Sequence, residues 1–193
     1  MDEDRRRLLG ACAVLGAGAL LTPTAQAEPA GGPIPPLPST PTPGKPGDFD
    51  WLTGEWRIAQ RRKPSPTAEW DVFEGEATCW SILGGVCHIE ELRIPARNFS
   101  GMGLRLLDVE KRVWSDHWVN AKSGVVFTPG QTGSFEHGAG VFYSEDKDDQ
   151  GDLIALGLWD NIGPRNCRWR QAVSRDRGAT WDVSWIMDWS RVR

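Results

Sequence analysis

The feature that most constrains the fold of this chain is an alternation of apolar and polar residues that runs from Gly54 to the end. Successive side chains of a strand point to opposite faces, so this pattern predicts β-strands. The last such segment places five large apolar side chains on one expected face: Trp181, Val183, Trp185, Met187 and Trp189. The segment before it repeats the pattern with Cys167, Trp169, Gln171 and Val173.

Turn residues interrupt this alternation at short intervals, which indicates hairpins. After a first strand near Gly54, we expect strands within residues 67–82, 86–94, 101–109, 112–120, 133–137, 140–145, 153–162, 166–173 and 180–192. An open sheet of so many twisted strands would curl, and closure removes its exposed edges. Because every connection is short, the sequence predicts an all-β, up-and-down antiparallel β-barrel of about nine or ten strands.

The first 27 residues have the three parts of an export signal. Three arginines (5–7) precede an apolar stretch (8–21), and a small-residue cleavage site ends at Ala27. The apolar stretch is shorter than the roughly 20 residues of a membrane-spanning helix, so we expect no stable span in the mature chain. The arginines before Leu8 and Leu9 resemble a twin-arginine signal, with a general secretory signal as the alternative. We therefore expect a periplasmic or secreted protein.

Residues 28–47 contain eight prolines, which exclude a helix or a central strand. We expect this segment to be a disordered, extended linker that precedes a single domain of residues 48–193.

The chain has 22 basic and 26 acidic residues and a formal net charge of −4. Beyond the export signal, the basic residues cluster only at Arg61, Arg62 and Lys63, so nucleic acid is not an expected partner. Three cysteines fall in the predicted domain: Cys79, Cys87 and Cys167. We expect buried thiols, with a disulfide from Cys167 to one of the other two as the alternative.

The segment FDWLTGEW, Phe49 to Trp56, begins the predicted domain. Its Gly54 and Trp56 resemble the Gly-x-Trp signature of the lipocalin and calycin superfamily. The resemblance implies that Trp56 covers one end of the barrel. It also implies that an arginine of the last strand, Arg191 or Arg193, packs over this tryptophan.

The whole predicted domain resembles a family of uncharacterised bacterial calycin-like proteins, which form a domain of unknown function. The matching pieces are the opening FDWLTGEW, the hairpin at Leu83-Gly84-Gly85 followed by Glu90-Glu91, and the closing segment Trp185 to Trp189. This resemblance implies a calycin-like or lipocalin-like barrel and leaves its activity open.

A barrel of this size encloses its own side chains and one small ligand. We expect a small apolar or aromatic molecule to bind between interior tryptophans, with Gln171 as a polar anchor. The predicted ligand-binding residues are His88, Glu90, Trp118, Trp169, Gln171, Trp185 and Met187.

Two alternatives remain open. One is a haem-binding barrel or an enzyme that uses a polar cluster around His88 and Glu90, with His88 or His117 as an axial haem ligand. The other is a structural or partner-binding module whose eleven tryptophans fill the interior, and an outward apolar patch would favour it. The sequence has neither a metal-ligand set nor a catalytic fingerprint, so we predict no cofactor and assign no catalytic residue. The oligomeric state is also left open.

Replacing Arg5 and Arg6 with lysines should block export, because the twin-arginine pathway recognises the arginine pair. Immunoblots of periplasmic and cytoplasmic fractions measure this directly. Undiminished secretion of the double variant would show that the signal is of the general secretory type.

Overall fold

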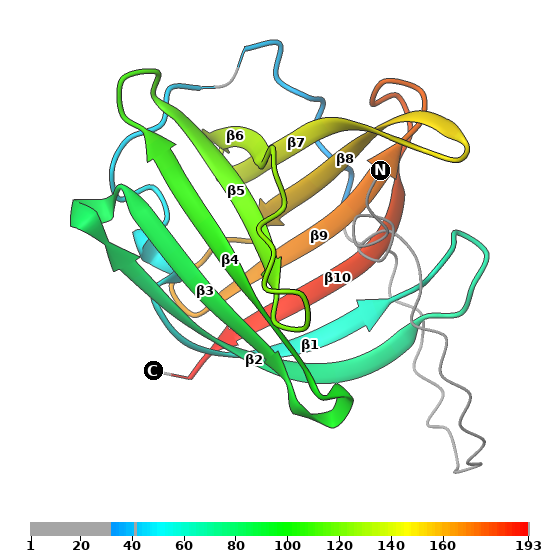
Figure 1. Ribbon diagram of the computed structural model, residues 1–193, viewed down its shortest axis with the longest axis horizontal. Helices are drawn as coiled ribbons and strands as arrows, with labels where there is room; N and C mark the ends of the chain where they lie inside the picture. Colours follow the sequence, from blue (N-terminus) through cyan, green and yellow to red (C-terminus); the bar gives the residue numbers. More distant parts are fainter. Residues whose placement is uncertain (1–31, 41, 193) are drawn as a thin grey trace.

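Ten antiparallel strands form one sheet that closes on itself, in the order β1-β10-β9-β8-β7-β6-β5-β4-β3-β2 (Figure 1). The computed structural model describes residues 32–40 and 42–192. The strands are β1 (Gly54–Arg62), β2 (Asp71–Ile82), β3 (Cys87–Ile94), β4 (Phe99–Asp108), β5 (Val113–Asn120), β6 (Gln131–Glu136), β7 (Ala139–Asp148), β8 (Gly151–Asp160), β9 (Asn166–Ser174) and β10 (Asp182–Arg191). The predicted up-and-down β-barrel is confirmed.

Helix in the described residues is limited to three short 3-10 turns: η1 (Asp50–Leu52), η2 (Leu83–Gly85) and η3 (Pro95–Arg97). No described helix has the length and apolar character needed to cross a membrane.

Pairing of the first strand with the last closes the barrel. β1 and β10 run antiparallel from the pair Trp56 and Arg191 to the pair Arg62 and Trp185. This register places the guanidinium carbon of Arg191 4.2 Å from the centre of the Trp56 ring. It is the packing that the calycin resemblance implies for Arg191; Arg193 lies outside the described residues.

The segment before β1 plugs one end of the barrel. Phe49 and Leu52 are buried, and the Trp56 indole donates a hydrogen bond to the Leu52 carbonyl at 2.7 Å. The Phe49 ring lies 5.0 Å from Trp114 and 4.8 Å from Phe135, both edge to face. Phe49 and Leu52 therefore belong to the hydrophobic core.

One predicted face is wrong. Trp185, Met187 and Trp189 face the barrel interior as expected, but Trp181 and Val183 pack on an outer cluster. The pairing of β10 with β9 shifts by a residue between Val183 and Trp185. A β-bulge of this kind reverses the face of the sheet to which the preceding residues of the strand point. The alternation of apolar and polar residues in the sequence does not reveal it.

The three cysteines of the domain are buried free thiols, as predicted. Burial raises the pKa of Cys79 and Cys167, with the Glu90 carboxylate adding to the effect. These thiols are therefore protonated and unreactive near neutral pH.

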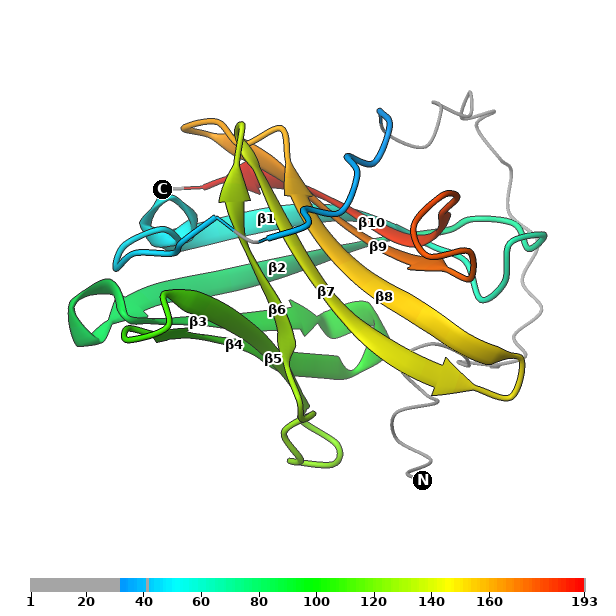
Figure 2. The same cartoon turned by 90° about the horizontal axis from the view of Figure 1, so that it is seen from above.

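The described part of the proline-rich segment does not extend freely from the barrel. It has no helix or strand, but Ile34 and Leu37 pack on an outer apolar cluster. That cluster is formed by Val141, Leu156, Leu158 and Ala172 of β7, β8 and β9. The buried Arg170 donates a hydrogen bond to the Gly32 carbonyl at 2.7 Å. Figure 2 shows this segment in blue beside the barrel.

A second set of hydrogen bonds joins the same segment to the barrel. The Gly44 amide donates to the Arg112 carbonyl at 2.7 Å, and the Arg112 side chain donates to the Gly44 carbonyl at 3.1 Å. A side chain at Gly44 would meet the Trp114 ring at 2.6 Å, so this close approach requires glycine. The folded unit thus includes residues on the linker side of the predicted boundary at residue 48.

Truncating Ile34 and Leu37 together to alanine should lower the free energy of unfolding by about 1 to 3 kcal/mol, because both partly buried side chains cover apolar residues of the sheet. Chemical denaturation of wild type and the double variant measures the difference. Val109→Ala, at a position 58% exposed, is the control and should change the value by less than about 0.5 kcal/mol. Equal unfolding midpoints for all three proteins would show that the segment adds no stability.

Candidate functional site

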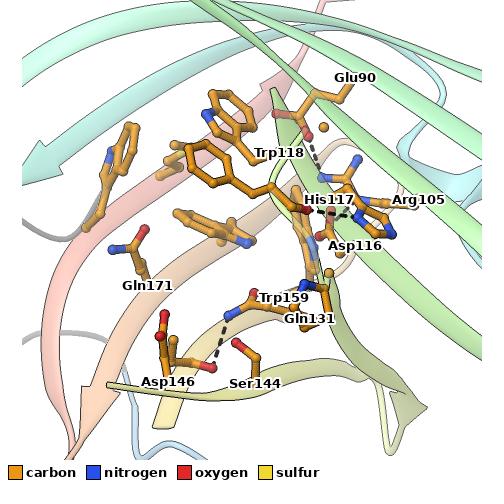
Figure 3. A pocket seen from close by; sticks show the side chains of 18 of the residues that line it. Glu90, Arg105, Asp116, His117, Trp118, Gln131, Ser144, Asp146, Trp159 and Gln171 are labelled. Carbon is orange, nitrogen blue, oxygen red and sulfur yellow. Dashed lines mark hydrogen bonds and ion pairs between the residues drawn. The ribbon is translucent and has the colours of Figure 1, made fainter. Parts of the chain in front are cut away.

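The barrel interior is not completely filled. A partly enclosed cavity of about 180 Å³ lies among side chains of the strands (Figure 3). Six of the seven predicted ligand-binding residues line it: Glu90, Trp118, Trp169, Gln171, Trp185 and Met187. The seventh, His88, lies outside the lining. The cavity also has residues that the sequence analysis did not select, above all Trp159, Trp189 and Arg105.

The short strand β6 leaves one wall of the cavity without a continuous sheet. β6 pairs with β5 only from Trp114 to Asp116, and with β7 only as far as Tyr143. Beyond these points the loop of residues 121–130 takes the place of a strand. Its Phe127 amide donates to the Trp118 carbonyl at 3.0 Å, and Phe127 lines the cavity. This loop therefore forms part of the cavity wall in place of a strand.

Two glycines of β4, the strand on the other side of β5, shape the adjoining wall. A side chain at Gly101 would meet the Trp118 ring at 2.2 Å, and one at Gly103 would meet the Arg105 guanidinium at 3.1 Å. The absence of side chains at these inward positions lets the Trp118 indole and the Arg105 guanidinium lie against the sheet.

A buried arginine binds two carboxylates at the inner end of the cavity. Arg105 Nη2 donates to Glu90 at 2.7 Å, and its Nε donates to Asp116 at 3.3 Å. Its Nη1 lies 3.3 Å from Nδ1 of His88. The side chains of Arg105 and Glu90 are 4% and 5% exposed. Three neighbouring strands, β3, β4 and β5, therefore bring one guanidinium and two carboxyl groups together away from solvent.

Burial changes the proton affinities of this cluster. Burial raises the pKa of Glu90 and of Asp116 above their ordinary values, and the adjacent Arg105 offsets part of the rise. Burial alone would lower the pKa of Arg105, but the attraction of Asp116 and Glu90 outweighs it and raises that pKa. Arg105 therefore stays charged, while the two carboxyls hold protons more tightly than exposed ones do.

Two aromatic rings lie close to the Arg105 guanidinium. Its central carbon lies 5.2 Å from the centre of the Phe49 ring and 5.3 Å from that of Trp159. Phe49 belongs to the plug and Trp159 lines the cavity. The charged cluster thus forms a layer between the plug and the cavity.

Neither histidine of the haem alternative directs a free ring nitrogen into the cavity. His88 is buried against Phe49, with ring centres 5.6 Å apart, and does not line the cavity. His117 does line it, but its Nδ1 donates to the Phe127 carbonyl at 3.1 Å and its Nε2 lies 3.2 Å from the Ser115 hydroxyl. The described residues contain no group of three or more side chains suited to a metal ion.

The comparisons with known proteins assign no activity. No family model matches the sequence, and no curated protein matches it. Among solved structures, the fold is similar to a crystal structure of a protein of unknown function from the DUF3598 family of Nostoc punctiforme, with 13% sequence identity and a TM-score of 0.42. The match covers 81% of this chain and 53% of the other, so this chain spans about half the length of that protein.

Replacing His88 should change how stability depends on pH. Burial and the nearby Arg105 lower the pKa of His88 to about 3, whereas an unfolded histidine titrates near 6.5. Between these values the unfolded chain binds more protons, so the free energy of unfolding falls as the pH falls, by up to about 1.4 kcal/mol per pH unit. His88→Asn removes this contribution and should give a shallower decline between about pH 6.5 and 4.

Unfolding by denaturant at a series of pH values measures these slopes. The control is His137→Asn, because the His137 side chain is 91% exposed and should leave the wild-type slope intact. Parallel curves for His88→Asn and wild type would contradict a neutral, buried His88.

Proposed function

We propose that this protein is an exported, calycin-like binding protein that holds a small molecule with an aromatic or apolar body in the barrel cavity. One observation carries the proposal: ten strands and their tryptophans leave a cavity of about 180 Å³ inside the barrel. A barrel that serves only as a structural module has no need of this space, because empty apolar volume costs stability.

The volume limits the ligand to about one aromatic ring or a compact pair of rings. A cavity of about 150 Å³ in a protein core is large enough to bind benzene. Trp169 and Trp185 pack edge to face with ring centres 5.9 Å apart, and Met187 lies beside Trp169 across the β9 and β10 pairing. Flat rings and a flexible thioether suit a flat apolar ligand.

Polar groups in the cavity lining orient this ligand. Gln171 lines the cavity and its amide nitrogen lies 3.4 Å from the Ser184 hydroxyl. The cluster of Glu90, Arg105 and Asp116 lines the same space. A few fixed polar groups in a mostly apolar pocket are typical of small-molecule sites.

Export and calycin kinship are part of the proposal. Export is supported by the signal-like residues 1–27, which lie outside the described residues. Kinship with calycins is supported by the closed barrel and by the guanidinium carbon of Arg191, which lies 4.2 Å from the centre of the Trp56 ring.

A partner-binding module is the second candidate, and one surface feature favours it. Exposed apolar side chains gather at β2, η2 and β4: Trp80, Ile82, Leu83 and Leu106. Leu106 pairs across the sheet with Cys87, which pairs in turn with Ile82, so these residues lie in one row. The simplest form of this role is self-association, which sedimentation velocity over a range of protein concentrations measures.

Filling the cavity should weaken ligand binding. Ala155→Leu adds a branched side chain to the lining, whereas Ala96→Leu makes the same change at an exposed position of η3. We expect wild type and Ala96→Leu to bind neutral probes of one or two rings, toluene and indole, and Ala155→Leu to bind them at least about tenfold more weakly. Ligand-observed NMR and calorimetry measure the affinities, and circular dichroism verifies the fold. A wild-type protein that binds neither these probes nor a charged aromatic molecule of similar size would contradict the proposal.

A further inference from the structure

The charges that line the cavity are not balanced. Within the cluster, two carboxyl groups, Glu90 and Asp116, share one guanidinium, that of Arg105. The described residues of the lining contain no lysine and no arginine other than Arg105. The surroundings of a bound molecule are therefore acidic.

A carboxylate in the barrel interior that has no counter-charge of its own is energetically unfavourable. Removing a carboxylate from water without a full counter-charge is energetically unfavourable, and a group in that position tends to take up a proton. The raised pKa values of Glu90 and Asp116 are in line with this cost. A second cation beside the cluster would balance the charge in place of that proton.

The aromatic walls are also suited to a cation. Tryptophan attracts positive charge to its ring face, because the face of the π-system is electronegative. Two of the lining tryptophans already lie under guanidinium groups: Arg105 over Trp159 at 5.3 Å, and Arg62 over Trp185 at 4.7 Å. The remaining rings, Trp118 and Trp169 among them, line the same cavity.

An anionic ligand has no comparable partner. Each nitrogen of the Arg105 guanidinium already has one partner, which accounts for three of its five N–H groups: Asp116 for Nε, His88 for Nη1 and Glu90 for Nη2. A ligand carboxylate in the cavity would meet like charges from Glu90 and Asp116 before it found a free donor on Arg105.

We infer that the ligand is an organic cation: an aromatic or compact apolar body that carries an ammonium, amidinium or guanidinium group. The cationic group lies toward Glu90 and Asp116, and the body lies among the tryptophan rings. This inference rests on the proposed function and specifies its ligand class.

Three probes of similar size and different charge test the inference on the whole folded chain. They are benzyltrimethylammonium, its neutral isostere neopentylbenzene, and the anion phenylacetate. At pH 7.5 we expect the cation to bind at least tenfold more tightly than the neutral isostere, and phenylacetate to bind more weakly than either. Calorimetry or ligand-observed NMR measures each affinity.

Neighbouring residues of β3 provide matched variants. Glu90→Gln removes a carboxylate from the cavity, whereas Glu91→Gln removes one from the exposed face of the same strand. We expect Glu90→Gln to weaken cation binding at least tenfold and to change binding of the neutral isostere less than threefold. Glu91→Gln should leave both affinities unchanged. Asp116→Asn should repeat the effect of Glu90→Gln, and it serves as the test if Glu90→Gln does not fold.

The outcomes distinguish a wrong ligand class from a wrong binding function. A neutral isostere that binds as tightly as the cation, or a cation affinity that survives both Glu90→Gln and Asp116→Asn, would overturn the inference and leave the proposed function standing. If no probe of any charge binds wild type, and toluene and indole also fail, the proposed function itself is wrong.

Discussion

The width of a closed ring of ten strands is the constraint on which the rest of this structure depends. About eight strands form an interior that side chains just fill, and two more enlarge it. Large side chains occupy much of this added interior volume. The fully buried tryptophans are Trp56, Trp114, Trp159 and Trp189. The plug around Phe49 closes one end, and the tryptophans toward the other end leave the cavity. The cavity thus follows from strand number and closure.

Between the plug and the cavity, the interior contains a charged layer where an apolar core would be more stable. Replacing a buried ion cluster with packed apolar residues is often stabilising, so such a cluster is weak evidence for a role in stability. Arg105, Glu90 and Asp116 form such a cluster: they come from three adjacent strands and border the cavity. Local departures from the best packing are expected where a protein binds something. This is the physical reason to propose a binding role for this cluster and not for the exposed carboxylates of the outer faces.

Much of the barrel could be predicted because its signals are local. Alternation in the segment from Trp185 to Trp189 and in the segment around Trp169 identified the inward residues, and six of the seven predicted ligand-binding residues line the cavity. Arg105 was missed because Leu104 and Leu106 flank it. Alternation predicts that the two leucines face the core and that the arginine between them faces solvent. In the structure these leucines point outward and the arginine inward, a reversal that two inward glycines and two carboxylates on other strands make favourable.

The sequence by itself determined the strand periodicity, the hairpin connections, the all-β class and the identity of most interior rings, because each depends on residues close together in the chain. Only the tertiary structure decided the bulge that turns Trp181 and Val183 outward, the packing of Ile34 and Leu37 on the sheet, and the loop that replaces a strand beside β6. It also decided that Glu90, Arg105 and Asp116 meet. These features depend on register between strands and on contacts between distant segments, and local alternation carries no information about either.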